Sequence, residues 1–582
     1  MRPVVLCSAL LLAACGDQAV GPPDEPDAPP PPEIDAAPVV PDAGLVVVSD
    51  PGPPVFPATA GTVSLSVRTG NGANDGTDAN EIDVCLRADR CYRLNVADVN
   101  DFRIGEMDVY HFYDQSLPRG SIDRVEIRST NGTDMWRPSC LAIQLDGEPV
   151  YCADGLTARF GNGGGSEVES FTDPLGLHLD CASCYPNKLT HGPMIGAVED
   201  DTIRVLVRTD ATRRVALRMT DDPTADLASA PTVSWLYPSP VRDYTGVLVA
   251  EGATPGRGYR YAVEVDGQLG PPRAVVAAPA DGQQTRFTFA FGSCTRLDDQ
   301  PLFDVIGGRT PDLFLFLGDN HYGNTPDLGG LRWHYRWALE RPERATLLAI
   351  TPTIATWDDH DFVGNNTTGA EPGKDVALRV FGEYWANPSV GSAATPGVFT
   401  VYRRGDVEFY LLDDRYWRGL ENDVLGSAQT AWLLSELESS TATFKLLASG
   451  SQWSANGSTD SWAAFLPARN ALFDALVARH IEGVVLLSGD IHRAELRLIP
   501  RAAAGGYDLP ELTSSPLANT NFACEPDMST ELDLISCFDQ GNSFILVDAD
   551  TTLADPLLDI EIIDQSGTTK ATWALRASDL QL

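Results

Sequence analysis

Between residues 283 and 582, short apolar runs alternate with longer amphipathic runs, and this alternation constrains the fold more than any other feature. A run that is apolar at nearly every position fits a strand buried on both faces of a sheet. Such runs lie at 287–291, 311–317, 409–412, 444–447 and 484–487, and further strand-like runs lie at 543–547 and 558–563. Helical runs lie between them at 328–339, 376–386, 427–437 and 467–480. Alternating strands and helices predict an α/β fold with helices on the faces of the sheet.

Several of these strands end in side chains that can bind metal ions. In chain order the strand ends are 291–294 (FGSC), 318–322 (GDNHY), 358–361 (DDHD), 413–415 (DDR), 449–453 (SGSQW) and 488–492 (SGDIH). In an open α/β sheet, ligands bind at the carboxyl ends of the strands. A single motif of this kind is usually a turn or a cap, but its recurrence in one region predicts a multi-metal pocket at one sheet edge.

The densest of these strand ends is the stretch 357–366, which follows the apolar and β-branched residues 353–356. Asp358, Asp359, His360 and Asp361 supply oxygen and nitrogen donors suited to hard or borderline metal ions. The alternative interpretation is a solvated acidic turn. The sequence also leaves open whether Asp358 or Asp359 contacts a metal.

The overall charge narrows the range of partners. The chain has 582 residues, 42 basic and 81 acidic side chains, and a formal net charge of −39. Nucleic-acid binding is not expected, because phosphate backbones require Lys and Arg. The charge is compatible with cation binding, although an acidic surface often only confers solubility. A length of 582 residues predicts three or four domains.

The N-terminus is typical of an exported protein. In residues 1–15, Arg2 precedes an apolar run at 4–12 that is too short to cross a bilayer as a helix. Residues 12–15 (LAAC) resemble the bacterial lipobox, which implies cleavage before Cys15 and a lipid on its sulfur. The alternative is an ordinary cleaved signal with an incidental cysteine. We expect a lipoprotein of the cell envelope, periplasmic or on the cell surface, with residues 16–60 as a disordered Pro-, Asp- and Ala-rich tether.

The cysteines fit an oxidising compartment. Of 11 cysteines, Cys7 lies in the signal and Cys15 at the anchor. Proximity in sequence predicts the disulfide pairs Cys85/Cys91, Cys140/Cys152, Cys181/Cys184 and Cys524/Cys537. The Cys181–Cys184 motif is also half of a zinc site, but the chain has no second CxxC to complete it. Cys294 is left over, and a lone thiol in an exported protein needs a reason.

Two β-rich units precede the α/β region. In residues 61–153, apolar and polar residues alternate in short runs that are separated by turn-forming segments. This pattern predicts a small β-sandwich. The segment 76–80 (GTDAN) before a strand, with 121–128 and 136–138 (WRP), resembles a PLAT (LH2) domain. That resemblance implies binding to lipids, membranes or proteins, sometimes with calcium, whereas the alternative is a spacer. We expect residues 154–188 to be an irregular insert. Residues 189–282 resemble a fibronectin type III-like sandwich that braces the α/β region.

The order of the strand-end motifs, FGSC, LGDxxY, WDDHD followed by NN, and SGDxH, resembles the PhoD-type alkaline phosphatases of the metallophosphoesterase superfamily. The resemblance covers residues 190–582 and includes the second sandwich. It implies a four-layer αββα core at 283–582. The second sandwich belongs to the family pattern, whereas the tether and the PLAT-like sandwich are additions to it. It also implies Fe³⁺ and Ca²⁺, although other divalent metals suit the same donors. The expected activity is hydrolysis of phosphate mono- or diesters outside the cytoplasm, in which a metal-activated water attacks phosphorus in line.

The resemblance assigns roles to individual residues. The implied metal ligands are Cys294 as thiolate, Asp319 as bridging carboxylate, Tyr322 as phenolate, Asp359 on the second metal, and Asp490 with His492. His360 would protonate the leaving oxygen or stabilise the transition state, and the alternative for it is a structural hydrogen bond. Arg379 would clamp a phosphate oxygen.

Two features separate this chain from the family pattern or from other hydrolases. His321 occupies a position that is usually apolar in the family, so it is a further ligand, a phosphate contact or a solvent-facing side chain. The chain has no serine nucleophile elbow and no phosphate-cradling glycine loop, which argues against a covalent serine route.

The sequence supports three classes of function. The first is a membrane-anchored phosphoesterase, and the PLAT-like domain favours lipid-linked or polymeric phosphodiesters as its substrates. The second is a surface-binding lipoprotein that recognises lipid or polymer through the PLAT-like domain and has a weak or inactive catalytic domain. The third is a calcium-dependent adhesin, which leaves the strand-end motifs unexplained. Chelation separates them, because an enzyme loses turnover whereas an adhesin loses attachment.

Overall fold

The computed structural model describes residues 187–454, 460–524 and 533–582, together with shorter stretches between residues 44 and 184. The predicted signal at 1–15, most of the predicted tether at 16–60, the segment 76–80 and Cys181 lie outside the described residues. Within the described residues, no helix is both long enough and apolar enough to span a membrane.

The first β-unit consists of two four-stranded sheets, in the orders β4-β1-β6-β7 and β3-β2-β5-β8. Its strands are β1 Thr62–Thr69, β2 Glu81–Arg87, β3 Arg90–Leu94, β4 Met107–Tyr113, β5 Val125–Thr130, β6 Pro138–Leu145, β7 Glu148–Asp154 and β8 Val168–Phe171. Alternating apolar residues of both sheets form one core, which includes Val63, Leu65, Ile82 and Ile127. The prediction that residues 154–188 are entirely irregular is wrong, because β8 lies in this segment and pairs antiparallel with β5.

The disulfides correct the predicted pairing. Cys85–Cys91 and Cys524–Cys537 are bonded as predicted, but Cys140 is bonded to Cys184. Proximity in sequence is misleading here because the strand register places Cys140 opposite Asp154, with Cys152 opposite Ala142. The predicted pairs Cys140/Cys152 and Cys181/Cys184 are therefore wrong.

The second β-unit is also a sandwich. One sheet has the order β13-β10-β9, and the other has the order β12-β11-β14-β15 with β16 paired to β14. Its elements are β9 Leu189–Val198, β10 Thr202–Thr209, β11 Val215–Thr220, β12 Thr232–Leu236, η1 Pro240–Arg242, β13 Thr245–Glu251, β14 Gly258–Val265, β15 Gln268–Leu269 and β16 Arg273–Val276. Valine and isoleucine side chains of both sheets fill its core.

The C-terminal region contains two larger sheets. The six-stranded sheet has the order β19-β18-β17-β27-β28-β29, and the seven-stranded sheet has the order β20-β21-β22-β23-β25-β24-β26. The strands are β17 Arg286–Gly292, β18 Leu313–Leu317, β19 Thr353–Thr356, β20 Thr400–Arg404, β21 Val407–Leu411, β22 Phe444–Ala448, β23 Val484–Ser488, β24 Ala494–Ile499, β25 Leu509–Thr513, β26 Asp533–Phe538, β27 Ser543–Asp550, β28 Leu557–Asp564 and β29 Thr569–Arg576. The strand-like runs at 543–547 and 558–563 thus complete the first of these sheets.

The helices occupy the segments between the strands. They are α1 Leu302–Gly308, α2 Leu328–Leu339, α3 Pro342–Leu348, α4 Asp359–Phe362, α5 Lys374–Tyr384, α6 Gly426–Ser439 and α7 Leu466–Ala478, with short 3-10 turns η2 Leu420–Asn422, η3 Trp462–Phe465, η4 Ala502–Ala504 and η5 Ala577–Leu580. The sequence predicts α2 at its observed bounds and α5, α6 and α7 within a few residues of theirs.

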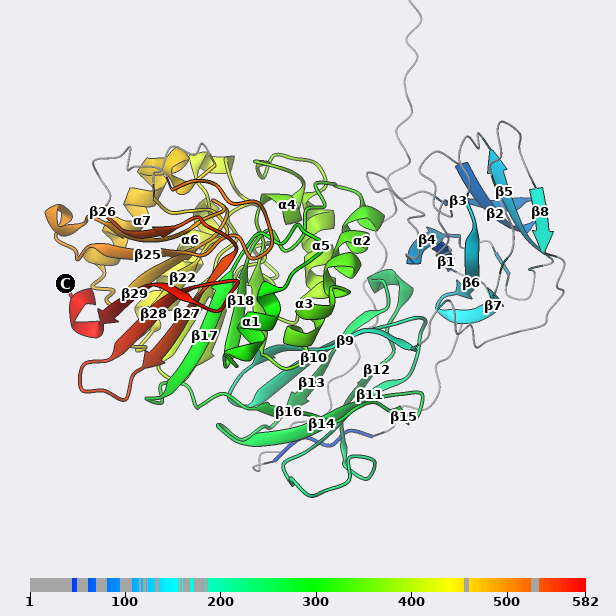
Figure 1. Cartoon of the computed structure of the whole chain (residues 1–582), viewed down its shortest axis with the longest axis horizontal. Helices are drawn as coiled ribbons and strands as arrows, with labels where there is room; N and C mark the ends of the chain where they lie inside the picture. Colours follow the sequence, from blue (N-terminus) through cyan, green and yellow to red (C-terminus); the bar gives the residue numbers. More distant parts are fainter. Residues whose placement is uncertain are drawn as a thin grey trace, which may run out of the picture. The chain divides into compact units, whose positions relative to one another are not determined.

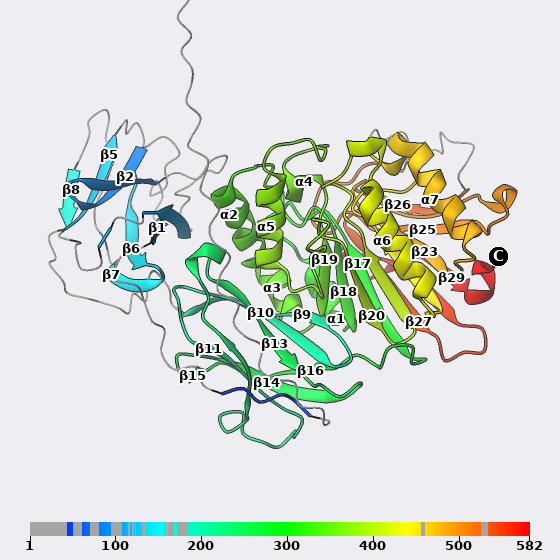
Figure 2. The ribbon, with the colours of Figure 1, turned by 180° about the vertical axis from the view of Figure 1, so that it is seen from behind.

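The two large sheets share one apolar core, in which Phe289 and Leu315 of one sheet pack with Leu446 and Val485 of the other. The helices α1, α2, α3 and α5 cover the outer face of the six-stranded sheet. The helices α6 and α7 cover the outer face of the seven-stranded sheet. Figures 1 and 2 show these two groups of helices on opposite sides of the strands.

Candidate metal centre

Two groups of potential ligands meet at the carboxyl ends of the strands. In one group, ligand atoms of Cys294, Asp319 and His492 all lie within 4.8 Å of one another. In the other group, ligand atoms of Asp319, Asp359 and His360 lie within the same distance. Asp319 belongs to both groups. A carboxylate with two oxygens in this position can bridge two metal ions, as the sequence predicts for it.

Each side chain reaches this place because its strand ends there. Cys294 follows β17, Asp319 follows β18 and Asp359 follows β19, and these three strands run parallel as neighbours. His492 follows β23 of the other sheet. The two large sheets therefore both contribute to the site, and the prediction that the strand-end motifs share one edge region holds for these four residues.

The backbone bends sharply at these strand ends. Cys294, Asp319, Asp490 and His492 all have positive φ, between 51° and 69°. Non-glycine residues rarely adopt this conformation, and it is concentrated at functional sites. Gly318 precedes Asp319 because a Cβ there would lie 2.8 Å from the backbone nitrogen of Asp358. The glycine of the LGD motif thus allows the β18 and β19 ends to approach each other.

Tyr322 completes the first group of ligands. Its hydroxyl lies 3.1 Å from Nε2 of His492 and accepts a hydrogen bond of 2.7 Å from Nδ2 of Asn519. Burial raises the pKa of the Tyr322 phenol well above its usual value, and the charges of Asp319 and Cys294 raise it further. Without a cation the phenol therefore keeps its proton, whereas a cation at this point favours the phenolate.

Asp490 faces the same group from the SGDxH motif. The thiol of Cys294 lies 3.6 Å from the backbone oxygen of Asp490, and the backbone nitrogen of Asp490 donates to Ser293 at 3.2 Å. Burial raises the pKa of the Asp490 carboxyl to about 7, and the negative charge of Asp359 adds to this effect. Of the predicted ligands, Cys294, Asp319, His492 and Asp359 belong to the two groups, and Tyr322 and Asp490 lie beside them.

The electrostatics of the group call for a cation from outside the chain. Burial raises the pKa of Cys294 and of Asp319 well above their usual values, and neighbouring carboxylates reinforce both shifts. One carboxylate oxygen of Asp319 is buried without a hydrogen-bond partner among the described residues. Buried charges that lack a protein partner are costly unless they coordinate metal ions. Carboxylate, thiolate, phenolate and imidazole donors together fit a centre for more than one metal ion.

Of the two adjacent aspartates, the geometry favours Asp359 as the ligand. Asp359 belongs to the second group of ligands, and its carboxylate also accepts from the backbone nitrogen of Asn366 at 2.6 Å. Asp358 is buried and forms an ion pair with Arg415. Arg415 is in turn held by Asp460 through two hydrogen bonds of 3.0 and 2.6 Å. Asp358 therefore positions the site from behind, while Asp359 faces it.

His360 lies beside Tyr322 at the mouth of the site, with ring centres 4.0 Å apart. Its Nδ1 lies 2.5 Å from Oδ1 of Asn324, which only accepts, so Nδ1 carries the hydrogen. Nε2 is then left to accept or donate a proton. Burial lowers the pKa of His360, although the negative charge of Asp359 acts to raise it.

Arg379, a predicted site residue, and His321, whose role the sequence leaves open, have environments that differ from those of the ligands. Arg379 donates to Glu383 at 3.2 Å and to the backbone oxygen of Val241, so its guanidinium is engaged away from the metal centre. The geometry gives no support to the phosphate clamp, because the guanidinium of Arg379 already donates to Glu383 and Val241. His321 is fully buried, so it does not face solvent, and it belongs to neither group of ligands. Its Nδ1 accepts from the backbone of Gly323 at 3.1 Å.

Sequence reasoning did not find several side chains that shape this site. Asn519 and Phe522 lie on a loop after β25 that contains no recognisable motif, and they contact Tyr322 and His492 respectively. Arg415 is visible in the sequence as the end of the DDR motif, and its charge beside two acids is the signal that could have identified it.

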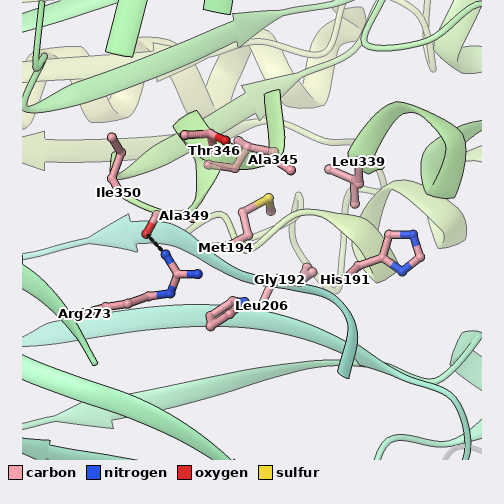
Figure 3. A pocket seen from close by; sticks show the side chains of 12 residues that line it. His191, Gly192, Met194, Leu206, Arg273, Leu339, Ala345, Thr346, Ala349 and Ile350 are labelled. Carbon is pink, nitrogen blue, oxygen red and sulfur yellow. Dashed lines mark hydrogen bonds between the residues drawn. The ribbon is translucent and has the colours of Figure 1, made fainter. Parts of the chain in front are cut away.

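A cavity of about 320 Å³ lies elsewhere and contains none of the predicted ligands. Figure 3 shows it between β9, β10 and the helix α3, with Met194, Leu206 and Ile350 in its lining. Arg273 donates to the backbone oxygen of Ala349 at 3.1 Å in this cavity. Its lining lacks clustered acids or thiols, so it does not compete with the metal centre as a candidate site.

Comparison with known proteins agrees with the geometry. A family model described as PhoD-like phosphatase matches residues 289–534, and a model described as a domain of unknown function (DUF7800) matches residues 186–282. Alkaline phosphatase D of Bacillus subtilis (strain 168) is 25% identical over 305 residues, which cover 42% of this chain and 52% of that relative. The match thus spans about half the length of the curated relative.

Two solved structures resemble the fold. The structure of PhoD has a TM-score of 0.54 at 17% identity, and the match covers 66% of this chain and 92% of that one. The purple acid phosphatase PPD1 of yellow lupin (Lupinus luteus) seeds has a TM-score of 0.52 at 12% identity, and the match covers 89% and 93% of the two chains. These identities are low, so the two structures show a similarity of fold alone. Residues 289–534 thus match the model of a PhoD-like phosphatase, and the fold resembles that of the PhoD structure.

Proposed function

We propose that this chain hydrolyses phosphate esters at the centre built around Asp319. The observation that carries the proposal is that Asp319 belongs to two adjacent groups of ligands and has no ion pair with a described basic side chain. Metal ions in such a centre bind phosphoryl oxygens and lower the pKa of a water molecule toward neutrality. Cys294, Tyr322 and His492 would hold one ion and Asp359 a second, with Asp319 shared between them.

The side chains at the mouth handle the substrate and its protons. His360 holds one proton at Nδ1 through Asn324, which fixes the ring orientation and leaves Nε2 as the atom that exchanges a proton with the ester oxygen. Asn519 donates to the Tyr322 hydroxyl and so fixes the phenol ring. Arg415 holds Asp358 and thereby supports the turn that carries Asp359 and His360.

The metals are proposed to be Fe³⁺ with Ca²⁺. A thiolate and a phenolate in one ligand group favour a transition metal, whereas the carboxylate-rich second group favours a hard cation. Other divalent ions suit the second group as well. The pairing of two sheets between two groups of helices supports an αββα layering for the domain.

The proposed location is outside the cytoplasm, on a membrane. The lipobox-like residues 12–15 support a lipid at Cys15, and the disulfides support an oxidising compartment. The first sandwich, if it acts as a PLAT-like domain, would favour lipid-linked or polymeric phosphodiesters. The disulfides bear on the compartment and not on the anchor, so the lipid itself rests on the sequence.

The test is hydrolysis of bis-p-nitrophenyl phosphate and p-nitrophenyl phosphate by the purified full chain, with and without a chelator. We expect turnover that chelation abolishes and that added metal ions restore, and the ratio of the two rates gives the preference for diesters or monoesters. The variant Asp319→Asn should be inactive with both esters, whereas Arg479→Ala, on the exposed end of α7, should match the wild type. A folded, metal-loaded wild type without turnover would instead indicate a lipoprotein that binds surfaces.

A further inference from the structure

Four side chains form a row at the mouth of the metal centre. The guanidinium carbon of Arg296 lies 5.9 Å from the centre of the Tyr322 ring. The Tyr322 hydroxyl is 3.1 Å from Nε2 of His492, and the His492 ring stacks on Phe522 with centres 4.8 Å apart and planes 22° apart. A cation and an aromatic ring thus stand at the two ends of a pair of predicted metal ligands.

Phe522 keeps its ring in solvent at this point. The side chain is 56% exposed, although a phenyl ring gains free energy when it leaves water. Its backbone nitrogen donates to the His492 oxygen at 3.0 Å, and the neighbouring Asn521 donates to the Gly541 oxygen at 3.0 Å. The loop is therefore anchored at Phe522 and at the residue before it. A single exposed apolar residue is ordinary on a surface, but here the ring is fixed against a candidate ligand of the metal.

Arg296 is a cation without a carboxylate partner. Its side chain is exposed and makes no hydrogen bond or ion pair with the described residues, in a chain with 81 acidic and 42 basic side chains. The nearby Asp298 faces Arg341 instead, at 3.5 Å.

The two ends of the row belong to loops that are tied together. The backbone nitrogens of Arg296 and Leu297 both donate to the oxygen of Ala518, at 2.8 and 3.0 Å. Ala518 lies on the same loop as Asn519 and Phe522. Leu297 is itself 43% exposed, so it adds apolar surface beside the cation. The row is a built feature of two joined loops, and it offers both a positive charge and an apolar face to a molecule bound at the metals.

We propose that Arg296 and Phe522 form a specificity subsite, in which Phe522 stacks on an aromatic group of the phosphate ester and Arg296 binds an anionic oxygen of the same phosphate. The substrate class is therefore aryl- or nucleobase-bearing phosphate esters in preference to small alkyl esters. The inference rests on the proposed function of the metal centre. Stacking on an aromatic side chain does not depend on which planar ring is bound, and it is strong enough to select a ligand. Arginine binds phosphate through paired hydrogen bonds.

The test measures binding separately from turnover. Phenylphosphonate and methylphosphonate carry the same anionic head, and neither is hydrolysed as an ester. Their affinities for the full chain, supplied with ferric iron and calcium, are measured by isothermal titration calorimetry. We expect the wild type to bind the phenyl compound on the order of 10-fold more tightly, the effect of one stacking contact. Phe522→Ala should lose that preference, and Phe522→Tyr should keep it.

The arginine arm gives a different signature. Arg296→Ala should weaken both phosphonates by about 10-fold and leave their ratio unchanged, because it removes a contact to the shared head. Arg296→Lys should recover part of the loss. Leu553→Ala and Arg479→Ala are matched controls, since both side chains are exposed and outside this row, and neither should change binding.

The outcomes separate this inference from the proposed function. An equal affinity for both phosphonates in the wild type, or a preference that survives Phe522→Ala, overturns the subsite even if the esters are hydrolysed. A phenyl preference that disappears in Phe522→Ala supports the subsite even if no ester is turned over. Melting curves of each variant show that the fold is intact.

Discussion

Asp243 and Asp319 are both fully buried carboxylates, but they differ in the source of the positive charge around them. Asp243 accepts hydrogen bonds from Arg208 at 3.1 and 3.2 Å and from Arg336 at 2.6 Å. Asp319 lies among other acids and a thiol, and no described basic side chain forms an ion pair with it. The chain neutralises the first site itself and leaves the second site for an outside cation.

The pKa values of the two carboxyl groups reflect this difference: the pKa of Asp243 is lowered and that of Asp319 is raised. Burial alone raises the pKa of a carboxyl group, but at Asp243 the charges of Arg208 and Arg336 outweigh it and hold the pKa well below its usual range. At Asp319 burial and the facing charge of Asp359 act together, and the pKa is raised. A paired buried acid indicates a structural joint, whereas an unpaired cluster of acids indicates a cation site.

The position of Asp243 fits a structural joint. His111 of the first sandwich approaches it with Nε2 at 2.8 Å, and Tyr384 of α5 donates its hydroxyl to it. Arg208 belongs to the second sandwich and Arg336 to α2. Residues from three parts of the chain therefore meet at a single carboxylate.

The largest effect on stability is expected from Asp243→Asn. Removing one partner of a buried ion pair leaves uncompensated charge, so the free energy of unfolding should fall by about 3–5 kcal/mol. Urea unfolding measures this change. Asp548→Asn is a matched control, because Asp548 pairs with Arg286 in a largely exposed bridge that is worth about 1 kcal/mol or less. Equal losses in the two variants would contradict the structural role of Asp243.

The same substitution at Asp319 should reduce metal binding and activity without reducing the stability of the metal-free protein. In Asp319→Asn the metal-free protein should keep or gain stability, because the variant removes a charge that burial and neighbouring acids oppose. Metal affinity and ester hydrolysis should fall by more than about 100-fold. Mutating a residue that only orients a metal ligand already lowers affinity or activity by about 10–100-fold. Metal-free urea unfolding, metal titration and kinetics measure these effects. A large loss of stability in the metal-free variant would mean that Asp319, like Asp243, has a structural role.

Arg415 sharpens the comparison, because it is the cation that holds Asp358 behind the metal centre. Lysine keeps the charge but cannot make the paired hydrogen bonds to Asp460. We expect Arg415→Lys to reduce metal affinity or activity by about 10–100-fold. Arg418→Lys is a control on the same turn, and its guanidinium nitrogen lies 3.4 Å from Asp460. An unchanged metal affinity in Arg415→Lys would remove the positioning role.

The smallest effect, taken per pH unit, is a dependence of stability on pH. Burial and the charge of Asp359 raise the pKa of Asp490 to about 7, against about 3.9 in an unfolded chain. A carboxyl group with a raised folded pKa contributes stability at low pH and loses it as pH rises toward 7. Between about pH 4 and 7, the metal-free wild type should lose up to about 1.4 kcal/mol per pH unit relative to metal-free Asp490→Asn.

Metal loading supplies the control for this pH effect. Bound cations hold Asp490 ionised in the folded state, so the slope should vanish in the metal-loaded pair. Urea unfolding at several pH values gives the difference. If the metal-free and metal-loaded proteins showed the same slope, Asp490 would not face the cations.

Local patterns explain what the sequence could predict. The period of the apolar residues marks α2 at 328–339, and the motif glycine Gly318 marks the turn before Asp319. The metal ligands follow because each lies directly after a strand, and strands that share a sheet edge bring their ends together. The disulfides Cys85–Cys91 and Cys524–Cys537 follow from short separations in sequence.

The features that sequence reasoning missed depend on distant contacts. The cluster at Asp243 joins residues as far apart as His111 and Tyr384, and no local pattern connects them. The Cys140–Cys184 disulfide depends on strand register. The environment of Arg379 was accessible, because Glu383 lies four residues later on the same helix, where side chains of opposite charge meet.

The most direct test of the central claim is the metal content of the purified full chain, measured by mass spectrometry for the wild type, Asp319→Asn and Asp243→Asn. Our account predicts at least two metal ions per folded wild-type chain, a loss of both in Asp319→Asn, and an unchanged content in folded Asp243→Asn. A folded wild type that binds no metal after exposure to iron and calcium, or an Asp319→Asn variant that keeps its full content, would contradict it.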